Sequence, residues 1–98
     1  MVRVIYRWQV GAENFEEFQK IWKETTKRIH DTVEGALGSF MLKSIENEEE
    51  VLTVAKWKSA ESWKSFWGKA NPEEMQAMRK LGVRISVEAF EEVEDHTR

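Results

Sequence analysis

The sequence predicts an α+β fold in which a four-stranded antiparallel sheet carries helices on one face. Segments with the two-residue period of strands alternate with segments with the 3.6-residue period of helices. They follow in the order strand, helix, strand, strand, helix pair, strand, with no linker between them. A chain of 98 residues is long enough for one small core. We therefore expect a single domain over residues 1–98.

The first strand is expected at residues 2–10, where side chains alternate between two faces. Val4, Tyr6 and Trp8 belong to a set that is uniformly apolar. The opposite set is mixed and places Ile5 among polar residues. We therefore assign the uniformly apolar set to the face that the helices cover.

An amphipathic helix is expected after the first strand. Asn14, followed three residues later by Glu17, is typical of an N-cap with its reciprocal partner. Gly35 is placed to end the helix near residue 34. The expected inward residues are Phe15, Phe18, Ile21, Trp22, Ile29 and Val33.

Residues 39–45 and 51–57 are expected to form two strands of a hairpin, joined by a strongly acidic turn. The second of these strands is apolar on both faces, interrupted only by Thr53 and Lys56. Continuous apolar character of this kind is typical of a strand covered on both sides. We therefore expect residues 51–57 to occupy a central position in the sheet.

Two short helices and a last strand complete the chain. Ser59 is expected to cap the first of these helices, Gly68 to end it, and Asn71–Pro72 to open the second. The last strand is expected at residues 85–93. The polar tail, residues 94–98, is expected to fray.

This element order, with right-handed crossovers, gives the ferredoxin-like split βαββαβ arrangement. If helices cover one face of the sheet, the other leaves Ile5 and one side of residues 51–57 in water. Monomers seldom expose apolar patches beyond a few hundred Å², and a standard interface buries roughly 800 Å² per partner. We therefore expect a homodimer packed sheet against sheet. The alternative is a monomer with a moderately apolar face.

The composition excludes several classes of function. The chain has no cysteine, and its only histidines are His30 and His96, so thiol chemistry is excluded and no metal site is expected. A net charge of −3 argues against nucleic acid or an anionic membrane as a partner. No apolar run reaches the roughly 20 residues of a membrane span, and the amino terminus lacks an apolar signal core. We expect a cytoplasmic protein.

Three stretches together resemble the antibiotic biosynthesis monooxygenase-like family of dimeric α/β barrels. They are VIYRWQV at residues 4–10, EGALGS at residues 34–39 and VAKWKSAESW at residues 54–63, within a resemblance that spans about residues 2–93. The resemblance implies a homodimer with a barrel-like core and a pocket in each subunit between helices and sheet. Family members include monooxygenases that oxidise phenolic or quinone-like substrates without metal or flavin. The resemblance therefore implies no cofactor.

Other members of that family degrade haem. The asparagine, tryptophan and histidine that they use fall here on Tyr6, Phe66 and Gln76. A chain without the axial histidine lacks the usual iron ligand. The sequence therefore disfavours haem degradation.

Polar residues interrupt the apolar stripe of the first helix. Trp22, Thr26 and His30 recur at every fourth position on one flank, and Thr25 is adjacent to them. As the lining of a pocket, they would present His30 as a base that takes a proton from a phenolic substrate, which can then pass an electron to O₂. The alternative is that the threonines bond back to carbonyls four residues earlier, with His30 at the solvent edge.

The candidate site combines these residues with others from the remaining elements. The predicted catalytic residues are His30 and Tyr6, whose buried hydroxyl requires a partner in the protein or in a ligand. The predicted substrate-binding residues are Trp22, Thr26, Trp67, Asn71 and Met75. The structural alternative is core packing for the tryptophans and Met75 and helix capping for Asn71.

The leading hypothesis is a cofactor-independent monooxygenase acting on a small aromatic or quinol-type substrate. The second hypothesis is a non-catalytic protein of the same fold that binds a small molecule or is associated with stress.

Overall fold

The computed structural model describes the backbone of residues 1–69 and 71–97 and the side chains outside residues 69–74. The elements follow the predicted order. They are β1 (Val2–Gln9), a single 3-10 turn (Ala12–Asn14), α1 (Phe15–Thr32), β2 (Ala36–Lys43), β3 (Glu50–Trp57), α2 (Ala60–Lys69), α3 (Asn71–Arg79) and β4 (Val83–Glu91).

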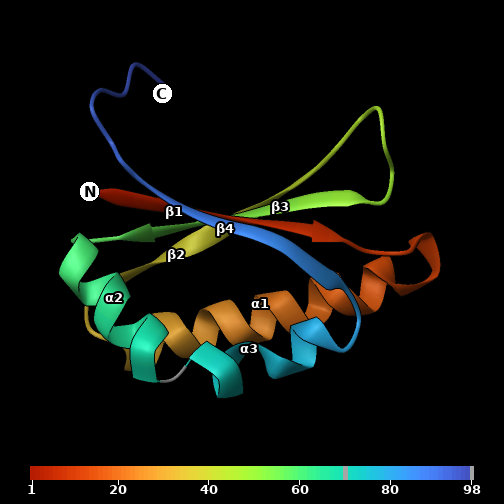
Figure 1. Cartoon of the computed structure of the whole chain (residues 1–98), viewed down its shortest axis with the longest axis horizontal. Helices are drawn as coiled ribbons and strands as arrows, with labels where there is room; N and C mark the ends of the chain where they lie inside the picture. Colours follow the sequence, from red (N-terminus) through yellow and green to blue (C-terminus); the bar gives the residue numbers. More distant parts are fainter. Residues whose placement is uncertain (70, 98) are drawn as a thin grey trace.

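The strands form one antiparallel sheet in the order β2-β3-β1-β4. All three helices lie on the same side of this sheet, which confirms the predicted ferredoxin-like α+β fold (Figure 1). β3 lies between β2 and β1, so the prediction of a central position for this strand is also confirmed. The edges of the sheet are β2 and β4.

The boundaries of the edge strands differ from the prediction. β2 begins at Ala36 rather than residue 39, and its register against β3 shifts between Ala36 and Ser39. β4 begins at Val83 rather than residue 85, and its register against β1 shifts beside Arg7 and Trp8. A bulge of this kind breaks the alternation of side chains from which a strand start is predicted. Both errors therefore have the same physical origin.

The predicted capping of α1 by the Asn14 side chain is wrong. Asn14 makes no side-chain cap hydrogen bond and has near-helical dihedral angles, φ −104° and ψ −4°. Its N–H instead donates to the carbonyl of Gly11, 2.9 Å away, within the 3-10 turn that leads into α1. The backbone therefore enters α1 through a continuous turn, and the side chain is not needed as a cap.

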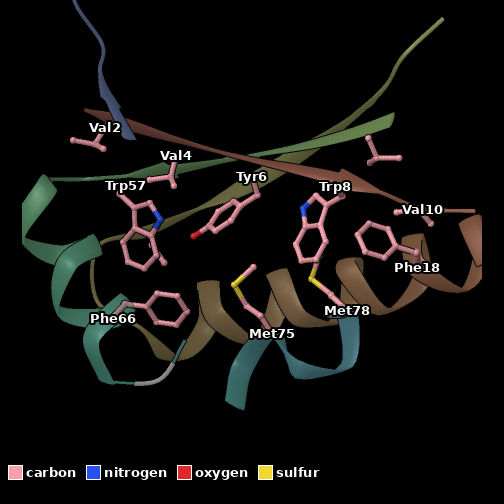
Figure 2. Close-up of a cluster of buried hydrophobic side chains, with 12 residues drawn as sticks. Val2, Val4, Tyr6, Trp8, Val10, Phe18, Trp57, Phe66, Met75 and Met78 are labelled. Carbon is pink, nitrogen blue, oxygen red and sulfur yellow. The ribbon is translucent and has the colours of Figure 1, made fainter. Parts of the chain in front are cut away.

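The core lies between the helices and the apolar face of the sheet (Figure 2). Trp8 and Phe18 are fully buried and meet edge to face, with ring centroids 5.1 Å apart. At the other end of the sheet, Trp57 lies against Phe66 of α2 at 5.3 Å. Large rings bury 150–250 Å² each, so these two pairs hold α1 and α2 against the sheet. Val4, Tyr6 and Trp8 are all buried here, as predicted.

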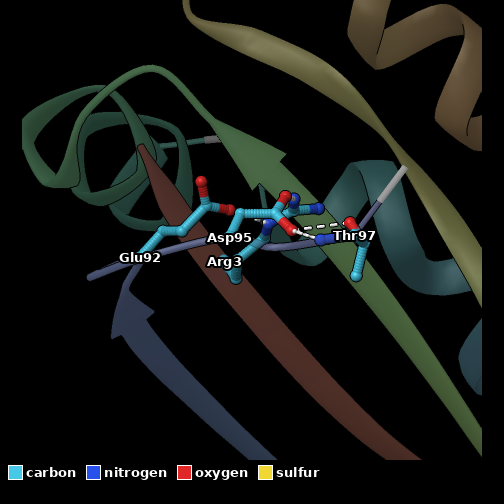
Figure 3. A network of polar contacts seen from close by, with 4 residues as sticks. All are labelled: Arg3, Glu92, Asp95 and Thr97. Atoms are coloured by element: carbon cyan, nitrogen blue, oxygen red, sulfur yellow. Dashed lines mark hydrogen bonds and ion pairs between the residues drawn. The ribbon is translucent and has the colours of Figure 1, made fainter.

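The chain beyond β4 is irregular but attached at its start (Figure 3). The Arg3 Nε–H donates to Glu92 Oε1 over 2.9 Å, and the Glu92 N–H donates to the carbonyl of Met1. Asp95 accepts hydrogen bonds from the backbone and the hydroxyl of Thr97, and these lower the pKa of the Asp95 carboxyl. The tail therefore leaves the sheet close to the chain's first residues.

Gly35 and Gly38 both have positive φ, +88° and +104°, but only Gly35 is crowded. A Cβ on Gly35 would lie 2.5 Å from the Cβ of Ser62, whereas nothing lies within 4 Å of one on Gly38. Gly38→Ala should cost about 1–2 kcal/mol of stability, from backbone strain alone. Gly35→Ala should cost at least about 1 kcal/mol more, because α2 must also shift. Chemical denaturation of both variants measures the difference, and equal losses would contradict the close approach.

Candidate functional site

A cavity of about 50 Å³ lies between α1, α2, α3 and the apolar face of the sheet. A cavity needs roughly 10–15 Å³ of such space to hold one water molecule, so this one has room for a few. Its residues are mainly aromatic, aliphatic or hydroxyl-bearing. They are Tyr6, Trp22, Thr25, Thr26, Ile29, His30, Ala36, Gly38, Ser39, Thr53, Ala55, Lys56, Trp57, Phe66, Met75 and Met78.

The cavity brings together five of the seven predicted site residues. They are Tyr6, Trp22, Thr26, His30 and Met75. Trp67 is not among the lining residues: its ring is stacked on Trp63 at 5.7 Å and lies behind the cavity-lining Tyr6, with ring centroids 5.9 Å apart. Asn71 lies outside the described side chains. The spacing of Trp22, Thr26 and His30 along α1 therefore correctly predicted that these residues share one wall of the cavity.

Two indole groups near the cavity are satisfied within the protein. The Trp8 Nε1–H donates to the hydroxyl of Thr53 over 3.1 Å, and both residues are buried. The Trp22 Nε1–H donates to Ser39 Oγ over 3.3 Å and so links α1 to β2. Buried polar groups are normally paired in this way. Thr53 and Ser39 thus have structural roles as acceptors.

One polar group that lines the cavity is fully buried and has no partner. The Nε1–H of Trp57, a residue that is 2 % exposed, has no hydrogen-bond acceptor in the described part of the chain. Thr25 also lines the cavity, but its hydroxyl is not among the fully buried unpaired groups of the described residues. The back-bond to a carbonyl four residues earlier, which was the alternative expected for Thr25 and Thr26, is found on α1 at Thr32, whose hydroxyl donates to the Arg28 carbonyl over 2.7 Å. An unpaired buried donor costs about 1–3 kcal/mol, which a ligand can recover.

His30 lies at the mouth of the cavity, half exposed on α1. Its Nδ1 is 3.9 Å from an oxygen of the adjacent Asp31 carboxylate. This distance exceeds that of a hydrogen bond, so the carboxylate can attract a protonated imidazole but does not fix its orientation. The His30 side chain is therefore in contact with both solvent and the cavity. In this position it can exchange a proton with water.

The Tyr6 hydroxyl reaches the cavity from β1 and has one defined partner. The Nε1–H of Trp63 donates to Tyr6 Oη over 3.3 Å. Burial raises the pKa of the Tyr6 hydroxyl, against smaller opposing effects of this hydrogen bond and of the positive charge on Arg84. Tyr6 is therefore a neutral phenol, able to donate its proton in a hydrogen bond.

The sequence interpretation did not include Thr25, Thr53, Trp57 and Phe66 among the site residues. Thr25 had a visible signal, because it interrupts the apolar stripe of α1 beside Thr26. Trp57 had none, since an indole in a central strand looks like core until its neighbours are known. Whether a buried N–H finds an acceptor is decided by residues distant in sequence.

No cluster of three or more His, Cys, Asp or Glu side chains that could hold a metal ion occurs among the described residues. Within the same residues, no helix is long and apolar enough to cross a membrane.

Comparison with known proteins identifies the family. The family described as antibiotic biosynthesis monooxygenase matches residues 1–81, so this chain belongs to the antibiotic biosynthesis monooxygenase family. No curated protein matches the sequence.

Several solved structures share the fold at low sequence identity. SnoaB, a cofactor-independent oxygenase from Streptomyces nogalater, is 14 % identical with a TM-score of 0.78, covering 99 % of this chain and 97 % of its own. A conserved protein of unknown function from Bacteroides thetaiotaomicron is 19 % identical with a TM-score of 0.73, covering 91 % and 94 %. Rv0793 from Mycobacterium tuberculosis is 12 % identical with a TM-score of 0.72, covering 98 % of each chain. These likenesses establish the fold.

The hydroxyls of Thr25 and Thr53, two residues that line the cavity, can be compared directly. The Thr25 hydroxyl is not fully enclosed and has no hydrogen-bond partner among the described residues, so Thr25→Val should change the free energy of unfolding by less than about 0.5 kcal/mol. Thr53→Val leaves the Trp8 N–H without its acceptor and should cost about 1–3 kcal/mol. Urea denaturation of the two variants measures this contrast. A loss of similar size in Thr25→Val would show that its hydroxyl is already satisfied.

Proposed function

We propose that this protein is a cofactor-independent monooxygenase that acts on a small aromatic or quinol-type substrate in the cavity. The observation that carries the proposal is the unpaired Trp57 N–H at an apolar cavity, with the half-exposed His30 at its mouth. Apolar walls with a few polar groups are typical of sites for flat organic ligands. Membership in the antibiotic biosynthesis monooxygenase family and the fold of a cofactor-independent oxygenase support this reading.

In the proposed reaction, His30 takes a proton from the substrate, which leaves a phenolate or carbanion. The anion passes one electron to O₂, and the two radicals combine to form a carbon–peroxide bond. Loss of water from the peroxide gives a quinone-type carbonyl. One atom of O₂ becomes the new carbonyl oxygen. The other leaves in water, which takes one hydrogen from the oxidised carbon and one proton from solvent. This proton replaces the one that the half-exposed His30 removed from the substrate and gave up to solvent.

The substrate enters by displacing side chains at the mouth. The cavity has room for only a few water molecules, so a flat ring requires Trp22 and His30 to move outward. Trp22 is held by one hydrogen bond to Ser39, at 3.3 Å, and by packing against the core, and contact with the bound ring compensates for the loss of both. Thr26, between them on α1, then contacts the substrate edge.

Oxygen uptake tests the reaction. With an anthrone as substrate, the wild-type protein should consume O₂ in a one-to-one ratio with the anthrone. His30→Ala should lower the rate at least about 100-fold, the range of general-base contributions. His96→Ala, which changes the chain's other histidine in the exposed tail, is the matched control and should keep the wild-type rate.

Equal rates in His30→Ala and the wild type would remove His30 as the base. Tight binding of the anthrone without uptake by the wild type would favour the alternative, a non-catalytic small-molecule binding protein.

We also propose that two copies associate through the outer sheet face, the side without helices. The register places on it Ile5, Phe40, Leu42, Leu52, Val54 and Phe90. Phe40 and Leu42 are 45 % and 49 % exposed, and monomers seldom leave such contiguous patches in water. Arg3 and Arg7 on this face form ion pairs with Glu92 and Glu50 of the same chain. These pairs lower the cost of covering the face with a second copy.

Phe40→Glu should dissociate the dimer, because it places a carboxylate in an apolar contact. The dissociation constant should rise at least about 30-fold, the effect of losing a central interface residue. Gln19→Glu adds the same charge on the exposed side of α1 and should leave the assembly unchanged. Sedimentation velocity across micromolar concentrations measures both variants. A wild-type protein that sediments as a monomer would refute this interface.

A further inference from the structure

The direction of the Tyr6 hydroxyl proton follows from its hydrogen bond to Trp63. An indole N–H can only donate, so Tyr6 Oη is the acceptor in this pair, at 3.3 Å. The phenol then keeps its own O–H as a donor. No described residue accepts a hydrogen bond from it. Because Tyr6 is buried and lines the cavity, a molecule in the cavity is placed to supply the acceptor that the described residues do not.

A second unpaired donor borders the same cavity. Figure 2 shows the phenol oxygen of Tyr6 and the indole nitrogen of Trp57 on the sides of their rings that face each other. Both residues line the cavity, from the adjacent strands β1 and β3. Two donors without acceptors favour a ligand oxygen, and they disfavour a ligand group that only donates.

We infer that Tyr6 is a specificity-determining residue, whose O–H selects, together with the Trp57 N–H, ligands that bring a carbonyl or phenolate oxygen. In this inference, Trp63 is the residue that positions the Tyr6 hydroxyl. This inference rests on the proposed function, since it names the ligand chemistry of the same cavity. Unlike that function, it requires no reaction.

Trp63 is itself held in place by its neighbours. Its ring is stacked on Trp67 at 5.7 Å, with an interplanar angle of 29°. The guanidinium of Arg84 lies over Trp67 at 4.9 Å, within the range of a cation–π contact. The positive charge of Arg84 also acts on Tyr6 and partly offsets the larger cost of burying a negative oxygen there. The stack thus fixes Trp63, and Trp63 directs the Tyr6 proton.

Two ligands with similar ring systems test the inference without turnover. Tetralone is a two-ring ketone that accepts hydrogen bonds and cannot donate them, and naphthalene does neither. Calorimetric titration gives the ratio of their dissociation constants. The wild type should bind tetralone at least about tenfold more tightly, and Tyr6→Phe, which keeps the ring, should reduce this preference about three- to tenfold.

A double-mutant cycle tests the positioning role of Trp63. Trp63→Phe should reduce the preference for tetralone in the wild-type background and have no further effect on it in Tyr6→Phe. A purely structural role would weaken binding of both ligands alike and leave the preference unchanged. An equal effect of Trp63→Phe in the two backgrounds would overturn its role.

The ratio of the tetralone and naphthalene dissociation constants in the wild type tests the selection of a ligand oxygen even if Tyr6→Phe fails to fold. Equal affinity for tetralone and naphthalene would overturn the inference and leave the cavity as an apolar binding site, consistent with the proposed function. If neither ligand binds while anthrone-dependent oxygen uptake persists, the inference fails and the proposed function stands. If binding and uptake are both absent, both fail.

Discussion

The structure depends on the burial of one face of β1 beneath the helices. Val4 and Trp8 are fully buried on this face, and Tyr6 lies between them in the chain. Residues that alternate along a strand share a face, so covering the two apolar neighbours also carries the Tyr6 hydroxyl into the core. The cost of burying this polar group is offset by the Trp63 N–H, which links the strand to α2. The packing of the sheet therefore creates the polar site.

The tryptophans show how a small core can combine packing with a site. Trp8 and Trp22 bury their rings and satisfy their N–H groups through hydroxyls of Thr53 and Ser39. Trp57 is just as well packed against Phe66, but its N–H is unpaired beside the cavity. A native core rarely leaves such a group unpaired. The same residue type therefore fills the core with its N–H paired in some positions and leaves an unpaired donor beside the cavity in another.

The two faces of the sheet differ in how they are completed. The helix-covered face is completed within the chain by rings and methionines that meet across the core (Figure 2). On the outer face, Val54 is only 7 % exposed, because neighbouring strands crowd it, while Phe40 on the edge strand β2 is open. In the proposed dimer, a second copy covers the outer face. Most of the residues that line the cavity lie on the opposite side of the sheet, under the helices.

The sequence by itself determined the element order, the central position of β3 and the apolar face of β1. These features follow from local periodicity, which is set by residues close together in the chain. It also placed Trp22, Thr26 and His30 on one flank of α1, since helical spacing alone decides this. The early starts of β2 and β4 were missed because bulges in strand pairing leave no simple period. Only the tertiary structure decided that Trp67 stacks on Trp63 and packs against the Tyr6 ring, and that the Trp57 N–H finds no acceptor among the described residues. Both outcomes depend on contacts between side chains that are distant in the sequence, and local sequence patterns do not predict such contacts.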